Sequence, residues 1–286
     1  MTEQTESLTP EERFWRDPPW RGGRTQFRLG LSQIAEDEWL DAPIDEGERA
    51  RKRRLLETRR DAVVRRVPGF EALEAAAAGF VAGVLRGRGV PAPEAPATLE
   101  ALALTVPDDL CLLAPSAEGH RLVAACLCAP SYWRLGEKIG KTMPGVHGPV
   151  PGLNDAVGDM LQRFFDNLPA GRVFRRRNFL IHQSDEPFHP EDERWELPVT
   201  PARCPSLFVR SETQTLRRVP DDGVLFTIRV QSLALGGIAR HPQAAADLLA
   251  AMDRMSDNER RAFGAAHHGV ALRQYLTSII NADADS

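Results

Sequence analysis

The stretch 207–230, LFVRSETQTLRRVPDDGVLFTIRV, sets two runs of strand-forming residues on either side of a short turn sequence. Val, Leu, Phe and Thr favour strands, and Pro-Asp-Asp-Gly at 220–223 favours a hairpin turn. We therefore expect antiparallel strands at about 206–219 and 224–233, joined by this four-residue loop. Similar runs that follow one another without an intervening helix predict an antiparallel sheet of about five strands, with the others at about 109–114, 121–128 and 177–183.

The expected loop also predicts which residues face each other across the hairpin. A loop that closes on Val219 and Val224 places Glu212 opposite Gln231, and Gln214 opposite Arg229. Because side chains alternate along a strand, one face would then carry a polar strip. Its members are Arg210, Glu212, Gln214, Thr227, Arg229 and Gln231. The residues leave two interpretations open: a water-exposed sheet face, or the wall of a polar pocket.

Helical periodicity predicts the other half of an α+β fold. The expected helices lie at about 46–66, 70–86, 153–167, 242–256 and 257–280. Residues 1–25 contain the breaker-rich DPPWRGG and little periodicity, which indicates a flexible N-terminal arm rather than a core element. We expect one domain over 26–286, because the chain is long enough to bury a sizeable core.

Composition excludes several classes of partner. The net charge of −4 gives no general attraction to nucleic acid. The polar start lacks a secretory leader, and no apolar run approaches the roughly 20 residues that cross a bilayer, so we expect a cytoplasmic protein without membrane contact.

The basic run 49–66 is either a solvated helix face or a docking surface for an acidic partner. The four cysteines are expected to be reduced core residues.

His147 stands out among the seven histidines because of its surroundings, MPGVHGPVPGLN at 143–154. Prolines and glycines on both sides predict that this segment is neither helix nor central strand. A histidine held on so stiff a loop can present its imidazole to a metal or cofactor, or it can pack a rigid connector. The common hydrolase, NTPase, zinc and dinucleotide motifs are all missing from the sequence.

The run 129–168, APSYWRLGEKIGKTMPGVHGPVPGLNDAVGDMLQRFFDNL, resembles the central signature of the haem-dependent oxidative N-demethylases. Three further segments agree in order: FRLGLSQIAEDEWL at 27–40, FRRRNFLIH at 174–182 and the hairpin at 207–230. The similarity spans about 26–280. It implies a PAS-like fold that binds haem b, with flanking helices around the sheet. The chain departs from the family pattern at Thr213, where the family has a basic residue, and at Phe179, where it has tryptophan.

The resemblance also implies roles for individual residues. His147 matches the position of the axial ligand to the haem iron. Residues that match family patterns or could hold the haem propionates are expected to bind the cofactor: Arg176, Asn178, Lys138 and Arg210. Matches in the hairpin are expected to be catalytic: Glu212, Arg229 and Gln214. Glu212 is the carboxylate that an alkylammonium substrate would favour.

The leading hypothesis is therefore a haem monooxygenase that removes an N-methyl group from a small secondary amine, such as dimethylamine. It would use O2 and electrons from a separate flavin or iron–sulfur reductase, because the chain has no motif for either group. A haem-binding PAS-type gas or redox sensor without turnover is the alternative from another class. A third hypothesis is a haem-free PAS-like binding domain in which His147 is only structural.

Overall fold

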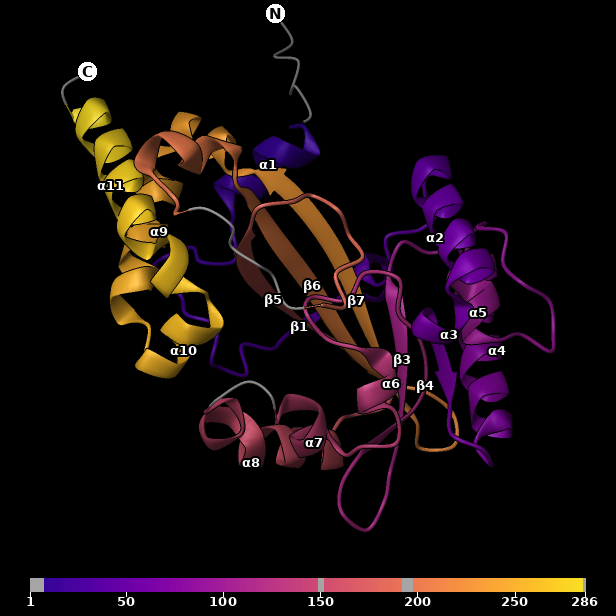
Figure 1. Cartoon of the computed structure of the whole chain (residues 1–286). Coiled ribbons are helices and arrows are strands. Elements are labelled where there is room, and N and C mark those ends of the chain that lie inside the picture. Colours follow the sequence, from indigo (N-terminus) through magenta and orange to yellow (C-terminus); the bar gives the residue numbers. More distant parts are fainter. Residues whose placement is uncertain (1–7, 149–151, 192–197, 285–286) are drawn as a thin grey trace, which may run out of the picture.

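The computed structural model describes residues 8–148, 152–191 and 198–284, which form an α+β fold (Figure 1). Its described strands make one antiparallel sheet of seven strands in the order β1-β5-β6-β7-β3-β4-β2. They span Ser32–Ile34 (β1), Val64–Arg66 (β2), Asp109–Ala114 (β3), Arg121–Cys126 (β4), Val173–His182 (β5), Phe208–Arg218 (β6) and Val224–Ala234 (β7). The predicted fold class is confirmed.

The predicted count of about five strands was too low, because β1 and β2 lie at the two edges of the sheet. Each has only three residues, which is too short for a period-two pattern to be visible in the sequence. The five strands that the sequence predicts are β3 to β7, and they occupy the centre of the sheet in the order β5-β6-β7-β3-β4. The likeness to PAS domains stays a prediction.

Three of the five predicted helices match single helices of the structure, and the other two are each divided. They span Pro10–Arg16 (α1), Glu46–Thr58 (α2), Arg60–Val63 (α3), Glu71–Gly87 (α4), Leu99–Leu102 (α5), Leu135–Lys138 (α6), Met143–His147 (α7), Leu153–Asp166 (α8), Pro242–Arg254 (α9), Asp257–Ala262 (α10) and Ala265–Ala284 (α11). The predicted helix 46–66 ends with α2 and α3, and its last residues form β2. The predicted helix 257–280 is divided at Gly264, whose φ of 71° is the left-handed conformation that ends helices.

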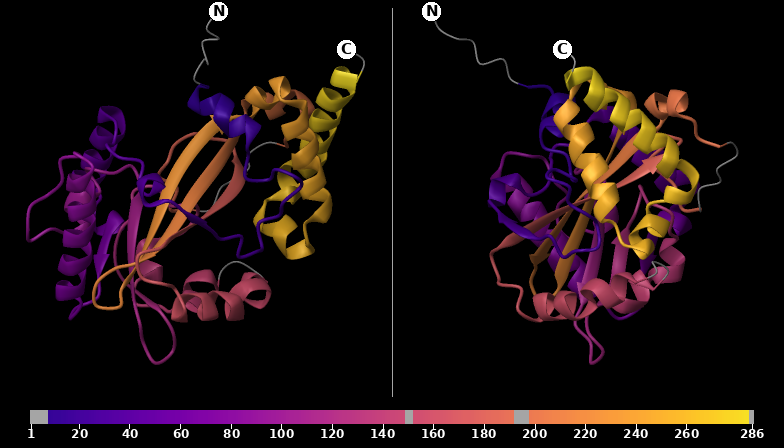
Figure 2. Two further views of the ribbon diagram at one scale, coloured as in Figure 1. Left: turned by 180° about the vertical axis from the view of Figure 1, so that it is seen from behind. Right: turned by 90° about the vertical axis from the view of Figure 1, so that its left-hand side faces the viewer.

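The helices gather in three groups around the sheet, as Figures 1 and 2 show. Helices α4 and α5 form one core cluster with β3 and β4, in which Leu110 and Leu112 are fully buried. Helices α9 and α11 form a second cluster with β6. Helices α6, α7 and α8 pack on β3, β4 and β7 in a third cluster, which includes Leu161 and Phe165. This third group covers the sheet face on which the candidate site lies.

The described part of the predicted arm, residues 8–25, is instead packed on the core. Trp15 and Trp20 are 2% and 0% exposed and belong to the cluster of α9 and α11. The Trp20 indole N–H donates to the carbonyl of Ala244 at 2.8 Å, and its ring lies 4.9 Å from that of Phe179. Isolated tryptophans between helix breakers leave no periodic signal, which is why the sequence pattern indicated an arm.

The cysteines behave as predicted, since all four are buried free thiols. Cys126 and Cys128 bring their sulfur atoms within 4.0 Å of each other. Within the described ranges, no group of three or more His, Cys, Asp or Glu side chains is arranged to hold a metal ion. None of the described helices is both long and apolar enough to cross a bilayer.

Candidate functional site

Five of the predicted site residues lie on one face of the sheet, on neighbouring strands. The β5–β6 register places Asn178 opposite Glu212 and Arg176 opposite Gln214, and Arg210 follows on the same side of β6. Opposed residues of an antiparallel pair share a face, so these side chains form one group. We call this side of the sheet the relay face.

The hairpin closes one residue differently from the prediction. Arg218 pairs with Val224, and the Val219 N–H donates to the Gly223 carbonyl at 2.8 Å, so the loop has five residues. Its two aspartates, Asp221 and Asp222, have φ angles of 57° and 58°. Aspartate can adopt the left-handed conformation at two consecutive positions. The sequence Pro-Asp-Asp-Gly is compatible with loops of four or five residues, so it does not specify this turn uniquely.

This one-residue shift moves Arg229 to the opposite face of the sheet. Thr213, not Gln214, pairs with Arg229, and Glu212 pairs with Val230. The prediction that Arg229 shares a face with Glu212 was therefore wrong, because a shift of one residue reverses every side chain of a strand. On its own face Arg229 donates to both carboxylate oxygens of Glu48, at 2.7 and 2.8 Å.

A hydrogen-bonded chain runs along the relay face. Arg210 donates its Nε–H to the Ser131 hydroxyl at 2.8 Å, and Ser131 donates in turn to Oε1 of Glu212 in a short hydrogen bond. Gln214 donates its amide to Oε2 of the same carboxylate at 2.7 Å. Both carboxylate oxygens of Glu212 are thus held in place, in a side chain that is largely buried. A carboxylate held on two sides is a pre-organised acceptor for a positively charged donor.

Arg210 also holds together the loops around this chain. It is 1% exposed, and its guanidinium donates to main-chain carbonyls of two loops: Ala129, Pro130, Glu186 and Pro187. Burial lowers the pKa of this guanidinium, and the nearby Glu212 raises it. Because protein oxygens engage its Nε, Nη1 and Nη2 atoms, Arg210 acts here as a clamp that positions Ser131.

Arg176 is the basic group of the relay face that retains an unused donor. Its Nη2 donates to the Gln26 carbonyl at 3.2 Å, whereas its buried Nε has no hydrogen-bond partner in the part of the chain that the structure describes. Burial lowers the pKa of Arg176, Glu212 raises it, and Arg28 lowers it further. A half-buried guanidinium with a buried Nε, beside a second arginine, favours an anionic partner.

Asn178 lies between Arg176 and the strand end. Its Oδ1 accepts the N–H of Phe179 at 2.9 Å, which leaves the side-chain NH2 as its donor group. The predicted cofactor residues Arg176 and Asn178 are therefore two positions apart on one strand, with their side chains on the same face.

His147 ends a short helix, which the sequence pattern did not predict. Helix α7 begins at Met143, and Pro144 lies in its first turn, where proline costs no hydrogen bond. The expectation that 143–154 contains no helix was therefore wrong. The side chain of His147 lies outside the described residues, so its predicted role stays a prediction. Lys138 on α6 donates to the carbonyl of Val146, the neighbour of His147, in a short hydrogen bond.

Segments that are far apart in the sequence contact one another around the edge of the relay face. The Glu259 carboxylate at the start of α10 accepts the N–H groups of Gln26 and Phe27, at 3.1 and 2.8 Å. The same Gln26 accepts a hydrogen bond from Arg176. Gly152 at the start of α8 packs so closely on Asn258 of α10 that a Cβ there would overlap it. Helices α7, α8 and α10 and the 26–27 segment therefore surround this part of the sheet (Figure 2).

Sequence patterns missed two members of this region. Ser131 joins Arg210 to Glu212, yet a lone serine after a proline carries no motif. Its neighbour Tyr132 stacks on His182 at 4.7 Å, and its hydroxyl lies 2.6 Å from Nδ1 of that ring. Burial lowers the pKa of His182 to about 3, so this imidazole is neutral. The only signal for Ser131 and Tyr132 was their place inside the resembling run.

Comparison with known families agrees with the resemblance. No curated protein matches the chain. A family model described as "Haem-dependent oxidative N-demethylase, alpha subunit-like" matches residues 83–268, which is more than half of the 286 residues and contains the relay-face strands and α7. That description names haem dependence, oxidative N-demethylation and an alpha subunit. The chain belongs to this family of haem-dependent oxidative N-demethylase alpha-subunit-like proteins.

Proposed function

We propose that the chain binds haem b at the relay face and oxidises the N-methyl group of a small secondary amine such as dimethylamine. One O2, two electrons and two protons convert the N-methylamine to a carbinolamine and water, and the carbinolamine collapses to formaldehyde and a primary amine. The observation that carries the proposal is the fixed Glu212 carboxylate next to Arg176, inside the family match.

The residues of the relay face suit a haem. Arg176 has a buried Nε without a partner among the described residues, which suits a propionate oxygen. Apolar side chains of the third cluster, including Ile228 and Val230, suit the flat macrocycle. Asn178 and Lys138 are further candidate donors to the propionates, whereas the donors of Arg210 are engaged by the protein. When bound, the haem would supply the activation of O2.

We propose that His147, the last residue of α7, would supply the imidazole that holds the haem iron. The support is its match to the family pattern and the short helix that holds its backbone. Asn154 of α8 donates to the Pro144 carbonyl at 2.9 Å, and Lys138 of α6 donates to the Val146 carbonyl. Two neighbouring helices therefore restrain α7, so that little further entropy is lost when the imidazole binds iron.

Glu212 would hold the substrate. A secondary amine is protonated at neutral pH, and a carboxylate fixed by Ser131 and Gln214 would accept its N–H and orient the methyl group. Arg210 acts through Ser131 and is a positioning residue in this scheme. Gln214 holds the second carboxylate oxygen, so that rotation of Glu212 away from the substrate is opposed from both sides.

The electrons would come from a separate flavin or iron–sulfur reductase, and the family description as an alpha subunit supports a partner of some kind. We place the enzyme in the cytoplasm. Arg229 is no longer proposed to act with Glu212, because it lies on the other face of the sheet. A sensor without turnover is the competing function, and the experiment below separates the two.

The test uses protein expressed with a haem supply. Absorption spectra of wild type and His147→Ala, ferric and dithionite-reduced, should show a shifted and weakened Soret band only in the variant. His267→Ala, which removes an exposed histidine, is the matched control. An unchanged Soret band in His147→Ala refutes the ligand assignment.

Turnover is measured as formaldehyde released when the reduced protein receives O2 and dimethylamine. Glu212→Gln should bind haem normally and release roughly a hundredfold less formaldehyde, because the amide cannot pair with an ammonium ion. Wild-type protein that forms a stable oxygen complex and no formaldehyde would be a sensor. Protein that takes up no haem would be the haem-free binding domain, and both results overturn the proposed function.

A further inference from the structure

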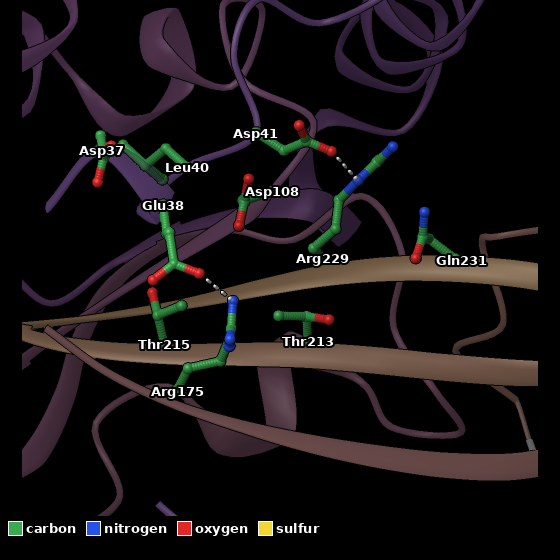
Figure 3. A pocket seen from close by; sticks show the side chains of 10 residues that line it. All are labelled: Asp37, Glu38, Leu40, Asp41, Asp108, Arg175, Thr213, Thr215, Arg229 and Gln231. Atoms are coloured by element: carbon green, nitrogen blue, oxygen red, sulfur yellow. Dashed lines mark hydrogen bonds and ion pairs between the residues drawn. The ribbon is translucent and has the colours of Figure 1, made fainter. Parts of the chain in front are cut away.

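A cavity of about 250 Å³ lies on the face of the sheet opposite the relay face (Figure 3). The loop between β1 and α2 forms one wall, and side chains of β5, β6 and β7 form the other. Its charged lining residues are Asp37, Glu38, Asp41, Asp108, Arg175 and Arg229. Thr213 and Thr215 add hydroxyl groups to the strand wall. The cavity is therefore smaller and more polar than a typical drug-sized pocket, and it suits only a small polar ligand.

The hydrogen bonds at its floor have one consistent direction. The Trp39 indole can only donate, and it donates to Thr215 Oγ1 at 3.1 Å. Thr227 donates to Oδ1 of Asp108 at 3.1 Å, so it accepts from Thr215, 2.7 Å away. Every member of this chain is largely buried. Oδ1 of Asp108 is thereby committed as an acceptor.

Oδ2 of Asp108 has no hydrogen-bond partner in the described structure, although the residue is only 3% exposed. Burial raises the pKa of Asp108 above its ordinary value, because the opposing effects of Lys52, Arg229, the Thr227 hydroxyl and the main-chain N–H of Asp41 are smaller. The Lys52 ammonium donates to the main-chain carbonyls of Val106 and Asp108 instead of this oxygen, at 3.1 and 2.8 Å. A buried carboxylate oxygen without a donor is costly, and a donor supplied by a ligand removes the cost.

The two arginines of the cavity are already matched by carboxylates. Arg229 is paired with both oxygens of Glu48, and its Nε lies 3.8 Å from Asp41. Arg175 pairs with Glu38 at 3.4 Å. Asp37 at the rim has no ion-pair partner among the described residues, and the lining carries more carboxyl groups than guanidinium groups. The cavity therefore favours a cation over an anion or a neutral molecule.

We propose that this cavity binds a small primary ammonium ion, which donates one N–H to Oδ2 of Asp108 and the others to oxygens of the rim. Only one oxygen of Asp108 is available, so the bidentate fork of a guanidinium cannot form, whereas a compact ammonium needs a single acceptor at each N–H. A quaternary ammonium has no N–H to donate. The site is separate from the proposed reaction at Glu212, because the two lie on opposite faces of the sheet.

Calorimetric titration of the haem-loaded full-length protein tests the proposal, with methylammonium chloride as the probe. Wild type should bind it, and Asp108→Asn should bind it roughly tenfold more weakly or worse, since the amide retains the shape without the charge. Asp61→Asn, an exposed aspartate on α3, is the matched control and should bind as wild type does. Tetramethylammonium and potassium chloride should not bind at this site.

A second variant tests the same cavity in case Asp108→Asn does not fold. Thr213→Lys places an ammonium on the cavity wall and should abolish methylammonium binding while the far-UV circular dichroism stays that of wild type. The haem absorption spectrum reports on the relay face separately. Binding that is lost in Glu212→Gln but kept in both cavity variants refutes the second site. Failure of wild type to bind, or equal binding of potassium, refutes it as well.

Discussion

Because His182 is buried and neutral, we predict that the free energy of unfolding decreases as the pH becomes acidic. It is 0% exposed and stacks on Tyr132, and burial lowers its pKa to about 3 from an ordinary value of 6.5. The unfolded chain therefore binds a proton on this residue at a pH where the folded chain does not. Its neutral state is compatible with folding above pH 6.5, and stability is lost as the pH falls from 6.5 towards 3.

The magnitude follows from the two pKa values. At pH 5 the unfolded imidazole is almost fully protonated and the folded one is neutral, which lowers the free energy of unfolding by about 2 kcal/mol relative to pH 8. His268 is also buried, and burial lowers its pKa to about 4, so it adds a loss of similar size. The comparison of wild type with a His182 variant isolates the first loss, because the second is common to both proteins.

Urea unfolding of haem-loaded protein at pH 8 and pH 5, followed by circular dichroism, measures these losses. His182→Gln should be less stable than wild type at pH 8, because it loses the ring stacked on Tyr132, yet it should lose about 2 kcal/mol less between the two pH values. His267→Gln removes an exposed histidine and should keep the wild-type dependence on pH.

An equal loss between pH 8 and pH 5 in wild type and His182→Gln would refute the reasoning. It would mean that the imidazole accepts a proton in the folded protein, and that the structure around Tyr132 opens in acid without unfolding. A difference that also appears in His267→Gln would assign the effect to total charge and not to burial.

The remaining predictions concern packing and the relay face. Trp20→Phe should lower the free energy of unfolding by about 1–3 kcal/mol in urea titrations, because a buried carbonyl of α9 loses its donor. Gly152→Ala and Gly171→Ala both force a Cβ into a left-handed backbone, which costs about 1 kcal/mol. Only the first meets a neighbouring side chain, so it should cost clearly more in the same assay. Ser131→Ala should reduce formaldehyde release roughly tenfold with an unchanged Soret band, whereas Ser278→Ala on exposed α11 should not.

Local patterns were sufficient for the α+β class and for the central strands. Alternating β-branched and aromatic residues predict β6 and β7. This pattern is local, because a strand buries one of its faces whichever elements pack against it. The edge strands β1 and β2 were missed, since their extended conformation depends on pairing with β5 and β4. Trp15 and Trp20 show the same limit, because their burial requires helices more than two hundred residues away.

The candidate site was predicted in part. Arg210, Glu212 and Gln214 share a face because alternation within one strand needs no knowledge of the turn. The position of Arg229 relative to them depended on whether the loop has four or five residues. The sequence Pro-Asp-Asp-Gly is compatible with both, and the choice is made by two aspartates in left-handed conformation. One residue of register therefore separated a predicted catalytic group from its partners.

The sequence by itself determined the fold class, the central strands and the family, because these follow from local periodicity and from a motif pattern contiguous in the chain. It also supplied the candidate residues of the proposed haem site. Only the tertiary structure decided that Ser131 links Arg210 to Glu212. Only it decided that, among the described residues, Nε of Arg176 and Oδ2 of Asp108 have no hydrogen-bond partner. These features depend on strand register and on contacts between residues far apart in the sequence, and neither leaves a local signal.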